Sequence, residues 1–145
     1  MSAKMALTRS KANQIIDVAF AKAREMKARP LGVVVVDASG DIISAQREDS
    51  ASMFRIDVGR AKAWGAVGMG TGGRGLAARA KDNPNFLLAL AHTAGGKLLP
   101  QPGGVLIRGA DGTILGAAGA SGGAAPEDEA VCVHGITVVG FQAEA

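Results

Sequence analysis

The residues with the clearest chemical potential lie in a glycine-rich segment. Residues 119–123 read Gly-Ala-Ser-Gly-Gly, and Pro126 follows with three acidic residues at 127–129. This order predicts a strand that turns through a loop into the first turn of a helix. Backbone N–H groups at a helix start carry partial positive charge and bind carboxylates or phosphates. We therefore predict an anion-binding loop with these donor positions: Gly119, Ser121, Gly122 and Gly123.

The predicted loop needs a cation nearby, because the acidic residues at 127–129 repel an incoming anion. The candidate cations are Arg55, Arg60 and Lys62 in an earlier predicted helix. Arg60 and Lys62 are two residues apart and do not share a helix face, so we expect one to point inward and the other to solvent. The predicted pocket lies between that helix and residues 119–128. The alternative is that the glycines only permit a sharp turn.

Three acid–base side chains follow the loop and could serve catalysis. Asp128, Glu129 or His134 could move a proton while the loop and Arg60 or Lys62 hold a carboxylate. Such a constellation suits isomerisation or tautomerisation of a small hydroxy, oxo or unsaturated carboxylic acid. An enzyme of this kind is one hypothesis for the chain.

A metal site is not expected from the histidines and the cysteine. His92 and His134 are the two histidines, and Cys132 is the one cysteine. A single Cys-x-His pair is not a structural zinc motif. In a helix the side chains of Cys132 and His134 diverge, and only in a strand would they share a side. We expect Cys132 to be a small buried hydrophobic residue.

The first half of the chain predicts a helix, two strands and a second helix. Apolar residues recur at helical spacing from Thr8 to about Ala28, with Thr8 or Ser10 as the cap. Residues 31–36 form a continuous apolar run typical of a central strand, and residues 42–47 return as its antiparallel partner. Residues 51–69 predict the helix that carries the cations.

The second half predicts two short helices, a second hairpin and a last helix. Residues 76–80 form one helical turn or two, and a further short helix begins at residues 83–84. Strands at 105–108 and 113–118 form the hairpin, which gives an antiparallel sheet of at least four strands flanked by helices, an α+β fold. The last helix begins at Pro126. Gly135 could end it, and residues 136–139 are either its continuation or a terminal strand.

Composition bounds the remaining possibilities. The length of 145 residues fits a single domain, and no apolar run is long enough to span a membrane. The net charge is +3, but the basic residues are spread along the chain without an aromatic platform, so we expect no nucleic-acid partner. The first seven residues lack the apolar segment of a secretory signal, and one cysteine forms no internal disulfide, which favours a cytoplasmic location.

Several segments along the chain have an order and spacing that point to a known family. They are Leu7-Thr8, Val33 to Asp37 with Gly40, Asp57-Val58, Arg60 to Ala63, Pro100 to Gly104, and Gly116 through Gly122 with Glu127 to Glu129. Together they resemble the GlcG/HbpS-like proteins, which include the C-terminal domain of PduO-type cobalamin adenosyltransferases, over nearly the whole chain. The resemblance implies an antiparallel sheet of four to five strands flanked by helices, similar to the profilin and PAS folds, and a homo-oligomer of two to eight subunits.

The resemblance also implies a ligand, namely haem or a related tetrapyrrole. Some relatives ligate haem from their first helix, which has no histidine in this chain. His134 is then the expected axial ligand, with His92, Cys132 or a methionine as alternatives. The hypotheses are therefore an oligomeric small-molecule-binding protein, the acid–base enzyme described above, and a purely structural subunit.

Overall fold

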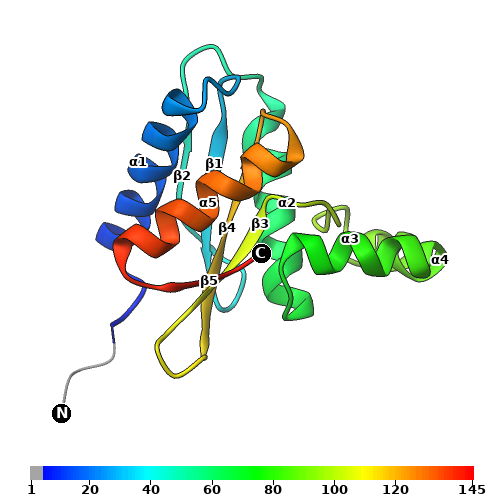
Figure 1. Cartoon of the computed structure of the whole chain (residues 1–145). Coiled ribbons are helices and arrows are strands. Elements are labelled where there is room, and N and C mark those ends of the chain that lie inside the picture. Colours follow the sequence, from blue (N-terminus) through cyan, green and yellow to red (C-terminus); the bar gives the residue numbers. More distant parts are fainter. Residues whose placement is uncertain (1–4) are drawn as a thin grey trace.

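A computed structural model describes residues 5–145, which form a five-stranded antiparallel sheet with helices on both faces (Figure 1). The strand order is β2-β1-β4-β3-β5. The predicted α+β fold is confirmed. In chain order the strands are β1 (Gly32–Asp37), β2 (Ile42–Arg47), β3 (Gly104–Arg108), β4 (Ile114–Ser121) and β5 (Gln142–Glu144).

The two predicted hairpins are present and join through their inner strands. β1 pairs with β4 along its whole length, from Gly32 opposite Ser121 to Asp37 opposite Gly116. Because of this pairing, β4 extends three residues beyond the predicted end at residue 118. Gly119 and Ser121 therefore belong to a central strand and not to a loop, which corrects the sequence prediction.

Helices form one layer on each side of the sheet (Figure 1). α1 (Arg9–Glu25) and α5 (Ala125–Val139) cover one face, and α2 (Phe54–Met69) covers the other. The β1 side chains alternate between the layers, with Val33 and Val35 in the α1–α5 core and Val34 and Val36 against α2. A strand buried on both faces has to be apolar throughout, which explains its sequence.

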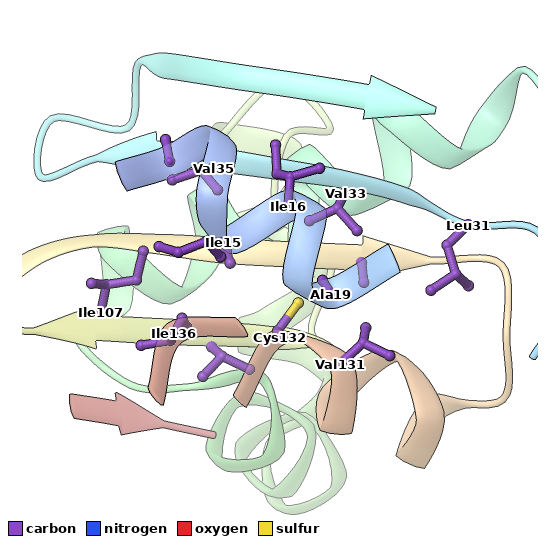
Figure 2. Close-up of a cluster of buried hydrophobic side chains, with 14 of the residues drawn as sticks. Ile15, Ile16, Ala19, Leu31, Val33, Val35, Ile107, Val131, Cys132 and Ile136 are labelled. Atoms are coloured by element: carbon purple, nitrogen blue, oxygen red, sulfur yellow. The ribbon is translucent and has the colours of Figure 1, made fainter. Parts of the chain in front are cut away.

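The main core lies between α1, α5 and the sheet (Figure 2). Gly135 brings the two helices together, since a Cβ atom there would lie 2.6 Å from the carbonyl oxygen of Ile15. Residues 136–139 continue α5, and Gly140, with φ +109°, ends it in the left-handed conformation. Gly135 is therefore a close-packing residue inside α5 and not its end. The core side chains labelled in Figure 2 include Ile15, Ile16, Val33, Val35, Ile107, Val131, Cys132 and Ile136.

Local backbone signals set the ends of the first two helices. Thr8 caps α1 by accepting a hydrogen bond from the Lys11 backbone N–H at 3.1 Å. α1 ends at Glu25, three residues before the predicted end, because Lys27 takes a left-handed φ of +57°. α2 begins at Phe54 instead of residue 51, after a turn in which the hydroxyl of Ser52 accepts from the Phe54 N–H.

The remaining helices, α3 (Gly73–Asp82) and α4 (Pro84–Thr93), form an arm that extends to one side of the sheet (Figure 1). α3 is longer than the one or two turns predicted. Asn83 caps α4 through its side chain, which accepts from the Phe86 N–H at 3.4 Å. Within the described part of the chain, no helix is long and apolar enough to cross a bilayer.

Candidate functional site

Two groups of predicted site residues lie on different sides of α5, and the first is a buried ion pair. Lys62 of α2 reaches Asp128 of α5 with its Nζ 3.2 Å from Oδ2. The same Nζ donates to the carbonyl oxygen of Ala120 at 2.9 Å. Lys62 is 5% exposed and Asp128 is 3% exposed. The pair thus connects helices from the two opposite layers of the fold.

Glycines make room for this connection at the start of β3. A Cβ atom on Gly104 would lie 2.4 Å from the backbone oxygen of Lys62, and one on Gly103 would lie 2.9 Å from the Lys62 Nζ. Gly103 also has φ +116°, which disfavours other residues. In the sequence these glycines stand out only as the end of the Pro100 to Gly104 segment. Their packing role depends on a residue about 40 positions earlier, so no local pattern could reveal it.

Two carboxylates of α5 accept hydrogen bonds from loop N–H groups that we predicted would bind an external anion. The Gly123 N–H donates to Asp128 Oδ1 at 3.0 Å, and the Ala124 N–H donates to Glu127 Oε1 at 2.9 Å. Such bonds satisfy N–H groups that a helix start leaves unpaired. Glu127 and Asp128 are therefore internal anionic partners of the loop as well as a source of repulsion.

The other glycines of the predicted loop have close neighbours. A Cβ atom on Gly119 would lie 1.9 Å from the carbonyl oxygen of Gly59, so Gly119 lets α2 approach β4. Gly122, with φ +135°, makes the turn after β4. Ser121 is 3% exposed, and its Oγ lies 3.5 Å from the Nη1 of Arg55.

Burial raises the pKa of two titratable side chains of α5 that face the interior, Asp128 and Cys132. Desolvation raises the pKa of Asp128, opposed by the charge of Lys62 and the hydrogen bond from Gly123. Burial also raises the pKa of Cys132 to about 12, and the charge of Asp128 adds to the effect. Cys132 is a fully buried thiol whose Sγ lies 3.7 Å from the Gly103 carbonyl oxygen, as expected for a small core residue.

Of the two cations two residues apart, Lys62 is the one that points inward. Arg60 is partly exposed, and its Nε is buried without an acceptor among residues 5–145. Arg55 is partly buried beside Ser121. The structure therefore brings Lys62, Asp128, Arg55, Ser121 and Gly123 together, and we call this set the buried corner.

The second group lies on the outer side of α5, around a surface hollow of about 460 Å³. His134 is exposed there, six residues and about one and two-thirds turns beyond the inward-facing Asp128. α1 contributes Lys22 and α3 contributes Arg74. We call this the outer hollow, and it is lined by Lys22, Arg74, Glu129, Ala130, Val133, His134 and Thr137.

Sequence reasoning named two residues of the outer hollow, Glu129 and His134, but missed the two cations. Arg74 holds Glu129 with two hydrogen bonds, Nε to Oε1 at 3.1 Å and Nη2 to Oε2 at 2.8 Å. These partners are 55 positions apart. The other histidine, His92, is exposed on α4 and lies outside both groups. No cluster of three or more potential metal-binding side chains occurs in the part of the chain that the structure describes.

Comparison with known proteins gives a consistent family and fold. A family model described as "Haem degrading protein HbpS-like" matches residues 7–137. The structure is similar to PduOC in its haem complex, with TM-score 0.85 and 26% identity over 97% of this chain and 100% of that one.

Two further solved structures extend the similarity. Protein ORFY of Klebsiella pneumoniae, of the family DUF336, gives TM-score 0.83 and 24% identity, covering 95% of this chain and 94% of that one. A double mutant of HbpS from Streptomyces reticuli gives TM-score 0.80 and 25% identity, covering 97% and 91%. Among curated proteins, none matches the chain significantly.

Proposed function

Because the chain belongs to the HbpS-like family, we propose that it binds haem or a related tetrapyrrole. The family description names haem, and PduOC, which has a similar fold over the whole chain, was crystallised with haem. The proposal concerns binding, and it places the ligand in the outer hollow.

The observation that carries the proposal is the composition of the outer hollow. A haem site needs an axial ligand, an apolar wall and partners for two propionate groups. His134 supplies an exposed imidazole, and Ala130 and Val133 supply an apolar wall beside it. Lys22 and Arg74 supply cations at the same hollow. The chemical types of these side chains therefore match what a haem site needs. Bound haem would supply the redox chemistry of its iron.

Four of the α5 residues that line the outer hollow lie along one stripe of the helix. Residues 130, 133, 134 and 137 recur at the spacing that places side chains on one face of a helix. The opposite face of α5 is held in the core by Val131, Cys132 and Ile136. His134 thus stands on a rigid element, which would keep its imidazole in place for an axial bond.

Titration of the purified protein with haemin tests the proposal. We expect a shift of the Soret band that is lost in His134→Ala. His92→Ala is the matched control, since His92 is also exposed but lies outside the hollow. A Soret shift that survives in His134→Ala, or one that is lost equally in both variants, would reject His134 as the axial ligand.

The acid–base enzyme remains a second hypothesis, with one observation in its favour. Asp128 has a raised pKa beside Lys62, a combination found in catalytic proton transfer. Both side chains are almost fully buried, so a substrate would have to open the corner. Thermal stabilisation by small dicarboxylic or hydroxy acids, without stabilisation by haemin, would favour this hypothesis over haem binding.

We also propose an assembly and a location for the protein. We expect a homo-oligomer of two to eight subunits in the cytoplasm, with no nucleic-acid partner. Light scattering of the purified protein measures the number of subunits, and a single molecular mass equal to that of the monomer would contradict the homo-oligomer.

A further inference from the structure

Arg74 and Glu129 form a two-bond clamp at the edge of the outer hollow. The clamp joins α3 to α5 through the two hydrogen bonds given above, and both residues line the hollow. Planar pairing of this kind is the geometry in which a guanidinium recognises any carboxylate. Arg74 is thus oriented for a carboxylate partner at the place where we propose a ligand.

The two partners of the clamp differ strongly in exposure. The Arg74 side chain is 71% exposed, whereas the Glu129 side chain is 13% exposed. The carboxylate is therefore fixed against the protein, and the guanidinium is the partner with room to move. An ion pair with one such exposed member contributes little net stability, so a second carboxylate can compete for Arg74.

A second cation of the hollow is held in a similar way. The Lys22 Nζ lies 3.5 Å from Glu25 Oε1, one turn along α1, and the Glu25 side chain is 72% exposed. Lys22 itself is 28% exposed at the side chain. Both cations of the hollow are therefore paired with acidic groups by contacts that solvent already reaches.

We propose that the outer hollow selects tetrapyrroles with free carboxylates, and that Arg74 exchanges Glu129 for a ligand carboxylate. This inference rests on the proposed function and adds a specificity residue, Arg74, and an internal competitor, Glu129. Removing the charge of Glu129 then strengthens binding of an acidic tetrapyrrole. Removing the charge of Arg74 weakens it.

An iron-free ligand separates this recognition from axial ligation by His134. We would titrate protoporphyrin IX and its dimethyl ester, in the same low fraction of dimethyl sulfoxide, and follow porphyrin fluorescence. For the free acid we expect about fivefold weaker binding by Arg74→Gln and about threefold tighter binding by Glu129→Gln, on the scale of a partly exposed ion pair. For the ester, both variants bind like the wild type, and more weakly than the wild type binds the free acid.

Matched variants control for general charge effects. Arg79→Gln removes an exposed arginine from the same helix as Arg74, and Glu127→Gln removes a carboxylate from the same turn as Glu129. Neither residue lines the outer hollow. We expect both controls to match the wild type, with circular dichroism reporting that all four variants are folded.

The outcomes separate the two proposals. Carboxylate exchange at Arg74 is overturned if Arg74→Gln and Arg79→Gln change the affinity for the free acid equally. It is also overturned if Arg74→Gln or Glu129→Gln changes the affinities for the free acid and the ester equally. In that event a haemin Soret shift that depends on His134 would still support the proposed function. Tighter binding by Glu129→Gln confined to the free acid supports the exchange directly.

Discussion

The buried corner and the outer hollow use the same helix for opposite purposes. On the inner side of α5, Asp128 meets Lys62, and each satisfies the other out of reach of solvent. On the outer side, Glu129 meets Arg74 in a pair that solvent reaches from the arginine side. Charge in a glycine-rich corner can thus serve folding, while the ligand site that we propose lies on the neighbouring face of the same helix.

The largest expected effect comes from breaking the buried pair. Lys62→Met leaves the Asp128 carboxylate buried without its cation, which we expect to lower the free energy of unfolding by about 3–5 kcal/mol. Urea denaturation at neutral pH measures it. Lys81→Met, at an exposed position on α3, is the control and should change stability by less than about 0.5 kcal/mol.

If Lys62→Met loses as little unfolding free energy as the control Lys81→Met, the Lys62–Asp128 pair does not hold the layers together. The loss should also shrink when the double variant Lys62→Met with Asp128→Leu removes both charges, because no buried charge then lacks a partner.

The next effect tests the close packing of the inner face of α5. Gly135→Ala places a Cβ 2.6 Å from the Ile15 carbonyl oxygen, and we expect a loss of about 1–3 kcal/mol. Gly68→Ala is a matched control, since Gly68 also lies inside a helix but a Cβ there meets nothing within 4 Å. That control should gain about 0.5–1 kcal/mol from helix propensity. Equal melting temperatures for the two variants would contradict the packing.

A smaller effect concerns the pH dependence of the corner. Since burial raises the folded-state pKa of Asp128 above its ordinary value of 3.8, the folded chain holds that proton more tightly than the unfolded chain. The resulting stability is present below pH 3.8 and is lost as the pH rises through the raised pKa. As the pH rises over that range, the free energy of unfolding of the wild type should therefore fall relative to that of Asp128→Asn.

Unfolding by urea at several pH values, for both proteins, measures this difference. If the free energy of unfolding of the wild type instead rises relative to that of Asp128→Asn as the pH rises, the charge of Lys62 and the hydrogen bond from Gly123 outweigh the effect of burial on the Asp128 pKa.

Local patterns predicted much of the fold but only part of the site. The apolar run of β1 and the Thr8 cap are set by neighbouring residues, so they could be read from the chain. The end of α5 could not, because Gly135 carries the signal of a helix end while serving close packing against Ile15. The Arg74–Glu129 clamp joins residues 55 positions apart, and no spacing rule connects them.

The most direct test of the division between the two regions is a haemin titration of three proteins: wild type, His134→Ala from the outer hollow and Ser121→Ala from the buried corner. We expect the Soret shift of the wild type to persist in Ser121→Ala and to be lost in His134→Ala. A shift lost in Ser121→Ala and retained in His134→Ala would place the ligand at the corner and contradict the account.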